Sequence, residues 1–328
     1  MSKKIADGFG DLGDLDEYYS FVQNGKVTLV GRKYIDQPNY HWGHRVAFVG
    51  TYVLVFDKET NQWEKNEFPE LSSKENLEEI LFVRNGKLHL LTYTSFGTIF
   101  FDKLFRWENN AFNEITLKAP EAKTLSENQK VDVLSASGIT TSGSTIILVK
   151  DDENAIQLYS LSIDGNYASI ENTSSISSEK NPLRGVPTLA ETVGEKVLIS
   201  YGVHGCGFHW ERSRFFIFNL ASKIVHSVYI EGEYNEHPEF GFRGPSVSHV
   251  NRDTRSWIVA SGSVQQGMTG SKFCGSVWAL KGNVFDENSQ ATWVKLPQTI
   301  EQGEHVFDGN TLYTITKEAI FEIQLDEI

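Results

Sequence analysis

The sequence has little cysteine and no long hydrophobic run, and each of these features excludes some classes of protein. Only Cys206 and Cys274 occur among 328 residues. Two cysteines do not make a disulfide framework in a chain long enough to build its own core, so we expect a reducing, cytoplasmic location. The first residues lack the apolar run of about 7 to 15 that a signal peptide needs. Nowhere do about 18 apolar residues follow one another as in a membrane span.

Basic residues are scarce relative to acidic ones. The chain has 30 Lys and Arg against 43 Asp and Glu, which gives a formal net charge of −13. Nucleic-acid phosphates and anionic membranes are bound by basic surfaces, so we expect neither as a partner. The acidic residues are scattered over turns instead of gathered in one tail, and this favours a role in solubility over a docking face for a basic partner.

Familiar catalytic motifs are missing as well. The chain contains no Gly-x-Ser-x-Gly and no Gly-rich phosphate loop followed by Lys, and no stretch of ten or more residues has a clean helical period. Carboxylates between the predicted repeats, at 69–71 and 231–237, are candidates for acid/base work, but carboxylates in loops are usually solvated. From these residues, whether the protein is an enzyme stays open.

What the sequence does contain is a recurring hairpin. Residues 53–57 alternate and are rich in β-branched and aromatic residues, 58–61 are polar turn residues, and a second strand restarts around Trp63. The aromatic residue of the first strand marks the position of each hairpin. By this marker, six copies of the hairpin follow one another along the chain. They are Phe56-Asp57, Phe101-Asp102, Tyr159-Ser160, Phe218-Asn219, Trp278-Ala279 and Phe321-Glu322. A period of about 40 to 60 residues with several strands per unit indicates a radial β array.

The hairpin resembles the third and fourth strands of a Kelch repeat, in which an aromatic-Asp pair closes one strand and a Trp opens the outermost one. The resemblance, which extends to the central domain of galactose oxidase, implies an all-β, six-bladed β-propeller of four-stranded antiparallel blades. The usual Gly-Gly doublet is reduced to Val30-Gly31, Tyr201-Gly202 or Ser261-Gly262 and is absent from units two and three. A WD40-like or seven-bladed propeller therefore remains an alternative.

One domain covering residues 1–328 is expected, because no linker divides the repeats. We predict blades, called units one to six below, at about 18–69, 77–118, 131–172, 183–232, 244–297 and 303–328. The last unit supplies only three strand-like runs, and residues 3–9 form a spare strand. We therefore expect the N-terminal strand to complete the last blade and close the ring, which removes exposed sheet edges. The turns Asn24-Gly25 and Asn85-Gly86 are strong hairpin signals.

The predicted binding face carries the loops between second and third strands. These loops are long in units one (32–44), four (202–213) and five (262–274), and long loops on a rigid scaffold collect binding residues. Two of them share a His-Trp pattern followed by Arg, in units that would lie opposite each other in a six-membered ring. The candidate binding residues are His41, Trp42, His44, Arg45, His209, Trp210, Arg212 and Arg243.

A metal site is the alternative at the same loops. His41, His44, His204, Cys206 and His209 are ligand types suited to zinc or copper. Their spacing is not a ligand signature, and the Tyr ligands of a Kelch-like copper oxidase cannot be placed, so we expect no metal and no cofactor.

The functional expectation from the Kelch resemblance is a monomeric propeller that binds a protein or peptide through this face, anchored by Trp and Arg. The alternative is a small-molecule enzyme, an isomerase or an oxidoreductase, that uses the central pocket.

Overall fold

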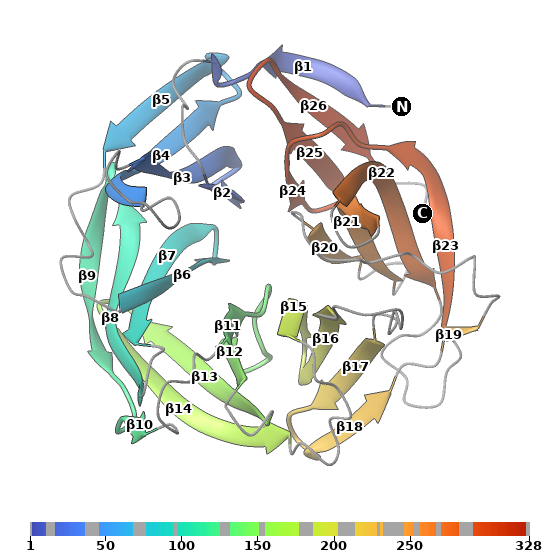
Figure 1. Ribbon diagram of the computed structural model, residues 1–328. Coiled ribbons are helices and arrows are strands. Elements are labelled where there is room, and N and C mark those ends of the chain that lie inside the picture. Colours follow the sequence, from blue (N-terminus) through green and yellow to red (C-terminus); the bar gives the residue numbers. More distant parts are fainter. Residues whose placement is uncertain are drawn as a thin grey trace.

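The protein is described by a computed structural model that covers residues 2–10, 17–36, 46–67, 77–94, 98–124, 132–150, 155–176, 186–202, 214–227, 230–231, 246–251, 256–266, 270–281 and 291–325. The described residues form strands arranged around a common axis (Figure 1). Among these residues, no helix has the length and hydrophobicity needed to cross a membrane.

The first three predicted units each contain four antiparallel strands in chain order from the axis outward. Unit one contains β2 (Glu17–Gln23), β3 (Lys26–Asp36), β4 (Val46–Asp57) and β5 (Gln62–Glu67). Unit two contains β6 (Leu77–Arg84), β7 (Lys87–Thr94), β8 (Thr98–Glu108) and β9 (Ala111–Lys118). Unit three contains β11 (Asp132–Ser135), β12 (Thr145–Lys150), β13 (Ile156–Asp164) and β14 (Tyr167–Ile176).

The remaining units keep the same order. Unit four contains β15 (Val186–Val193), β16 (Lys196–Gly202), β17 (Arg214–Asn219) and β18 (Ile224–Ser227). Unit five contains β20 (Ser246–Asn251), β21 (Ser256–Gln266), β22 (Gly270–Lys281) and β23 (Ala291–Thr299). Unit six contains β24 (Glu304–Asp308), β25 (Thr311–Ile315) and β26 (Ala319–Gln324), and β1 (Lys3–Asp7) pairs antiparallel with the outer side of β26.

The hydrogen-bonded sheets differ from the prediction of one separate sheet for each unit. Units two and three share one nine-stranded sheet, because β14 pairs in parallel with β9 and the short β10 (Lys123–Thr124) pairs with β8. In unit five, β19 (Ile230–Glu231) adds a fifth strand in parallel with β23. Outer edges that would be open in isolated four-stranded sheets are thus partly paired.

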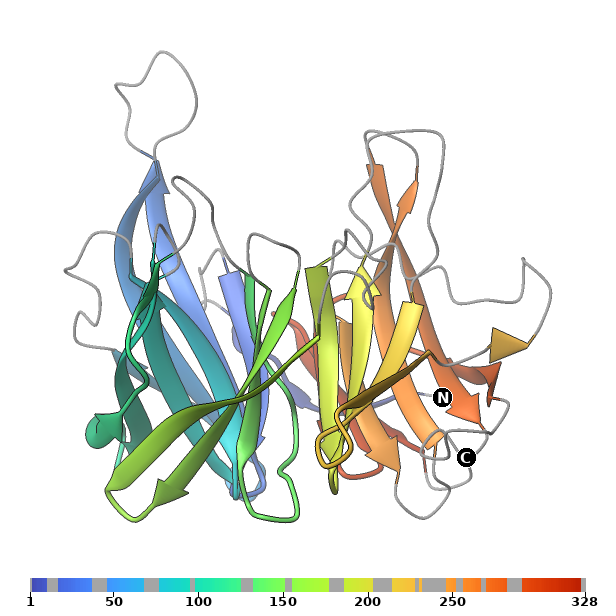
Figure 2. The ribbon, with the colours of Figure 1, turned by 90° about the horizontal axis from the view of Figure 1, so that it is seen from below.

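The innermost strands contact one another in sequence around the axis. Each contacts the innermost strand of the unit on either side, in the order β2, β6, β11, β15, β20, β24 and back to β2. The side view shows these strands running along the axis (Figure 2). We call the end of the ring where the innermost strands begin the upper end, and the end where they finish the lower end.

The core lies between neighbouring units, and the two-residue period of a strand assigns each side chain to one neighbour. In β4, Leu54 and Phe56 pack toward unit six with Tyr313. The alternate residues Val53 and Val55 pack toward unit two. Each sheet is therefore buried on both faces, which explains strands that are nearly continuous in apolar residues.

The predicted Asn-Gly turns are confirmed by their backbone angles. Asn24 and Gly25 have φ of 49° and 72°, and Asn85 and Gly86 have φ of 50° and 72°. Both residues of a tight hairpin turn need positive φ, which Asn and Gly tolerate best.

Two predicted loops turn out to be partly strand. In unit five, residues predicted as the loop 262–274 extend the hairpin, with Ser263 opposite Phe273 and Gln266 opposite Gly270. In unit one, β3 continues to Asp36, inside the predicted loop 32–44. These polar residues form strands despite their turn propensity, because an adjacent hairpin arm supplies hydrogen-bond partners for their backbone.

The predicted equivalence of the six aromatic positions also needs correction. Phe56-Asp57 and Phe218-Asn219 close their strands, and the carboxylate or amide of the second residue accepts two backbone N–H groups of the following turn. In unit two, however, Phe101 lies in the middle of β8, which continues to Trp107-Glu108. The aromatic positions are therefore not structurally equivalent in all units, because β8 is longer than the repeat predicted.

Candidate functional site

The loop residues predicted as a binding site lie outside the described residues. These are His41, Trp42, His44, Arg45, His209, Trp210, Arg212 and Arg243, together with the candidate ligands His204 and Cys206. Within the described ranges, no group of three or more His, Cys, Asp or Glu residues is arranged to hold a metal ion. A site must therefore be sought among the described residues at the upper end of the ring.

Acidic residues are first or second in four of the innermost strands that the structure describes. Glu17 opens β2, Asp132 opens β11, Glu304 opens β24, and Glu78 is the second residue of β6. Because all innermost strands run in the same direction along the axis, these residues belong to the same upper end (Figures 1 and 2). The arc they form spans the consecutive units six, one, two and three.

Glu304 has the most unusual environment of these acids. It pairs across β24 and β25 with Ile315, which belongs to the core between units six and one. Burial raises the pKa of Glu304 to about 7, and no described residue forms a hydrogen bond or an ion pair with it. A carboxyl group kept partly protonated near neutral pH is suited to donating a proton.

The backbone before Glu304 explains how it reaches this position. A Cβ on Gly303 would lie 2.5 Å from the carbonyl oxygen of Ile315. Only glycine permits such a close approach of the two strands. The next residue, His305, is fully buried, its Nδ1 lies 3.1 Å from the Thr314 hydroxyl, and Ser20 donates a hydrogen bond to its carbonyl oxygen. These contacts hold the start of β24 in place.

Glu78 has a defined partner. It lies directly opposite Tyr93 in the pairing of β6 with β7, and the Tyr93 hydroxyl donates a hydrogen bond of 3.0 Å to Glu78 Oε2. Burial, followed by the charge of Glu78, raises the pKa of Tyr93 well above its usual value, with smaller contributions from Asp132 and Tyr19. Side chains from β2, β6, β7 and β11 thus converge at the upper end.

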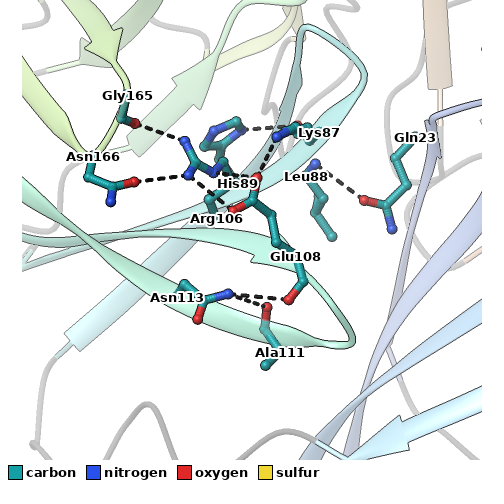
Figure 3. A network of polar contacts seen from close by, with 10 residues as sticks. All are labelled: Gln23, Lys87, Leu88, His89, Arg106, Glu108, Ala111, Asn113, Gly165 and Asn166. Atoms are coloured by element: carbon teal, nitrogen blue, oxygen red, sulfur yellow. Dashed lines mark hydrogen bonds and ion pairs between the residues drawn. The ribbon is translucent and has the colours of Figure 1, made fainter.

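The lower end carries a different kind of cluster, which links units two and three (Figure 3). Arg106 donates to the carbonyl oxygen of Gly165 at 2.8 Å, to Asn166 Oδ1 at 3.1 Å and to Glu108 Oε2 at 3.0 Å. Lys87 also contacts Glu108, and Lys87 and then Arg106 hold the pKa of Glu108 below its usual range. Because these groups pair with one another and with turn backbone, the cluster has a structural role.

Arg84 extends this connection into the interior. Its guanidinium donates to the carbonyl oxygens of Leu161 at 2.9 Å and Ile163 at 3.4 Å, both in β13 of unit three. The side chain is buried, and desolvation lowers the pKa of Arg84. Nearby, burial lowers the pKa of His89 to about 4, so this histidine is neutral at physiological pH.

Comparison with known proteins shows the fold. No family model and no curated protein matches the sequence. An α-L-arabinanase from Penicillium chrysogenum, solved with arabinobiose, is similar with a TM-score of 0.54 and 10% identity, over 100% of this chain and 99% of that chain. A GH43 β-1,3-galactosidase has a TM-score of 0.48 and 7% identity, over 90% and 98%. The Nup133 β-propeller domain from Vanderwaltozyma polyspora has a TM-score of 0.47 and 9% identity, over 96% and 83%.

The chain is therefore an all-β propeller with four-stranded antiparallel blades. At 10% identity, the likeness to the arabinanase concerns the fold alone. The Kelch-type or galactose-oxidase-like assignment is not confirmed by these comparisons.

The predicted function as a Kelch-like module for protein or peptide binding is wrong. The structure that shares this fold over 100% of this chain and 99% of its own length is an arabinanase, which is an enzyme and not a protein-binding module. The prediction was wrong because a repeated hairpin indicates how a propeller packs and carries no information about its function.

The acids of the innermost strands were not among the residues predicted from the sequence. The carboxylates predicted as candidates for acid/base work were those in the segments between units, at 69–71 and 231–237, which lie outside the described residues apart from Glu231. The available signal was positional, because Glu78, Asp132 and Glu304 are each the second residue of a predicted unit. Their convergence became visible only once the strands were arranged around one axis.

Proposed function

We propose that the protein is a glycoside hydrolase whose active site lies at the upper end of the ring. The observation that carries this proposal is Glu304, a desolvated carboxyl on an innermost strand with no described partner, on the same rim as Glu78 and Asp132. Hydrolysis of a glycosidic bond needs one carboxyl group that donates a proton and a second, ionised one on the other side of the sugar. The fold shared with an arabinanase supports this chemistry.

Glu304 acts as the general acid in this proposal. As the bond between the anomeric carbon and the leaving oxygen breaks, Glu304 transfers its proton to that oxygen. A pKa of about 7 keeps the proton available near neutral pH and still permits its release in the transition state. Water then completes the cleavage, and Glu304 recovers a proton from solvent.

Neutral sugars fit this rim better than acidic ones. The chain has a net charge of −13, and three described carboxyl groups lie at the upper ends of neighbouring innermost strands. A uronic acid residue would meet like charges at short range and would be disfavoured. The substrate class is therefore a neutral oligosaccharide or polysaccharide, such as one built from arabinose, xylose or galactose.

A substrate panel with leaving groups of different acidity tests the role of Glu304. We would compare arabino-, xylo- and galacto-oligosaccharides with the matching p-nitrophenyl glycosides. For the oligosaccharide that is cleaved, Glu304→Gln should lower kcat by about 10² to 10⁴-fold. For the nitrophenyl glycoside the loss should be much smaller, because nitrophenolate leaves without a proton.

The matched control is Asp308→Asn, since Asp308 lies on the same face of β24 at the lower end, 3.6 Å from Lys58. This variant should keep its activity on both kinds of substrate. The proposal would be overturned if the wild-type protein cleaved no member of the panel, or if Glu304→Gln lowered both activities equally.

We also propose that the ring is six-bladed and is closed by the N-terminal strand. In support, Trp63 of β5 donates to the carbonyl oxygen of Asp7 at 3.3 Å, and Phe9 packs edge-on against Trp63 with ring centroids 6.1 Å apart. A Cβ on Gly8 would lie 2.4 Å from the carbonyl oxygens of Thr316 and Lys317. Gly8→Ala should therefore lower the melting temperature clearly, whereas Gly10→Ala, where nothing lies within 4 Å of the added Cβ, should lower it less.

A further inference from the structure

Three carboxyl groups with described side chains lie at the upper end of the ring, and glycoside hydrolysis needs one of them as a partner for Glu304. Glu78 and Asp132 are the candidates, and they belong to β6 and β11, which contact each other. They differ in how they are held. Glu78 accepts a hydrogen bond from a buried phenol, whereas no described residue forms a hydrogen bond with Asp132, which lies across from Lys150 in the pairing of β11 with β12.

The Tyr93 ring is fixed by its surroundings. It is 4% exposed and belongs to the core between units two and three, together with Phe101 and Tyr159. Phe101 and Tyr159 pack edge to face with centroids 5.2 Å apart, so this part of the core is aromatic and well defined. The position of the hydroxyl is therefore set by packing, and the hydroxyl in turn sets the position of the Glu78 carboxyl group.

The hydroxyl can act only as a donor at ordinary pH. Burial and the nearby groups Glu78, Asp132 and Tyr19 raise the pKa of Tyr93, so that the phenol keeps its proton. A phenol that donates to a carboxylate forms a charge-assisted hydrogen bond, which is shorter and stronger than one to a neutral acid. This contact favours the ionised form of the carboxyl group that accepts it.

We propose that Glu78 is the carboxylate that works opposite Glu304, and that Tyr93 is the residue that positions it. The assignment rests on the proposed glycoside hydrolase function. In the reaction, the bond from the anomeric carbon to the leaving oxygen breaks and that oxygen takes the proton of Glu304. A water molecule forms the new bond to the anomeric carbon, and Glu78 takes the proton that this water releases.

The positions of the two strands agree with these roles. β6 and β24 both contact β2, one on each side. Glu304 lies on the face of β24 that packs toward unit one, and Glu78 lies on the face of β6 that packs toward unit three. Tyr19 of β2 lies between them in the order of strands and is 44% exposed. An exposed aromatic ring at this end of the ring is suited to contact a sugar ring.

Tyr93→Phe tests the positioning role because it removes only the hydroxyl. On the oligosaccharide that the wild type cleaves, we expect kcat to fall about tenfold with KM nearly unchanged. The acidic limb of the pH profile should move to higher pH, because the carboxylate loses its donor. Glu78→Gln should lower kcat by about 10² to 10⁴-fold, and the double variant should lose no more than Glu78→Gln alone.

The control is Tyr159→Phe, which alters a tyrosine of equal exposure in the same core cluster. It should change neither kcat nor the pH profile. A readout that does not depend on activity is the ¹³C NMR titration of protein labelled at glutamate carboxyl carbons. The signal missing in Glu78→Gln identifies Glu78, and its titration midpoint should rise in Tyr93→Phe.

The outcomes separate this inference from the function on which it rests. If Asp132→Asn abolishes cleavage and both Glu78→Gln and Tyr93→Phe leave it intact, the assignment of Glu78 is overturned and the hydrolase function survives. If no glycoside is cleaved by the wild type, both are overturned, even where the NMR titration shows the Tyr93 contact. An unchanged titration midpoint in Tyr93→Phe overturns the positioning role by itself.

Discussion

The lower and upper ends of the ring differ in how Arg106 and Glu304 are paired. At the lower end, Arg106 and Glu108 pair with each other, and Arg106 reaches the turn of unit three (Figure 3). At the upper end, Glu304 is desolvated and no described residue bonds to it. Buried polar groups are normally paired because an unpaired one costs stability. The difference assigns a structural role to the lower end and agrees with the proposal that the active site lies at the upper end.

The two ends also differ in how their ionisable groups affect the stability of the folded state. Perturbed carboxyl groups at functional sites weaken the folded state, and satisfied networks elsewhere offset that cost. Arg84 illustrates the second case, because its buried guanidinium binds two carbonyl groups of the neighbouring unit.

The largest expected effect is a loss of stability in mild acid, caused by one buried histidine at each end. Burial lowers the pKa of His89 and of His305 to about 4, from an ordinary value of 6.5. Between these values the unfolded chain binds protons that the folded chain does not, so stability falls as pH falls. Each histidine should contribute a loss of up to roughly 3 kcal/mol by pH 4.

Urea unfolding at pH 7 and pH 5 measures this loss. His89→Gln and His305→Gln should each reduce the difference in unfolding free energy between the two pH values, whatever their effect at pH 7. Equal stability of the wild type at both pH values would contradict the prediction.

The second effect is the loss of the connection through Arg84. Arg84→Met keeps an apolar stem but leaves the carbonyl groups of Leu161 and Ile163 without this donor. We expect a loss of about 2 to 3 kcal/mol in unfolding free energy, as for hydrogen bonds to buried charged groups. Lys118→Met, at an exposed position of β9, is the control and should change stability by less than about 0.5 kcal/mol. A similar loss in both variants would remove the structural role assigned to the lower end.

The third effect has the opposite sign and belongs to the upper end. The folded pKa of Glu304 is raised to about 7, so between pH 4.5 and 7 the folded state keeps a proton that the unfolded chain has released. Stability from this group therefore falls as pH rises through that window. Glu304→Gln should be more stable than the wild type by up to about 3 kcal/mol at pH 8 and no more stable at pH 4.

Thermal unfolding at both pH values tests this prediction. The exposed Glu301→Gln provides the control, with no change expected at either pH. If Glu304→Gln were destabilised at pH 8, the side chain would be a structural element like those of the lower end.

The smallest effect is expected from a surface ion pair. Lys103 and Glu114 lie 3.0 Å apart, with 45% and 55% of their side chains exposed. Exposed pairs are screened by solvent and salt and lose side-chain entropy on pairing. Replacing both residues by Ala should leave the melting temperature unchanged within error, and a clear decrease would show that outer-strand charges also hold the units together.

Much of the backbone could be predicted from local signals. Asn24-Gly25 and Asn85-Gly86 predicted their turns because few residue pairs tolerate two positive φ angles in succession. Strand positions such as 53–57 followed from alternation of β-branched and aromatic residues. The extent of the hairpin arms did not follow, because Ser263 and Gln266 are paired by a neighbouring strand and not by their own propensity.

A repeated array of four-stranded antiparallel units could be predicted from the chain alone, because strand period and turn chemistry act over a few residues. Only the tertiary structure decided which acids share one end of the axis, since Glu78, Asp132 and Glu304 are far apart in the chain. It also decided that Glu304 is desolvated while Glu78 is held by Tyr93. Burial and partners depend on the packing of neighbouring units, and no short stretch of sequence carries that information.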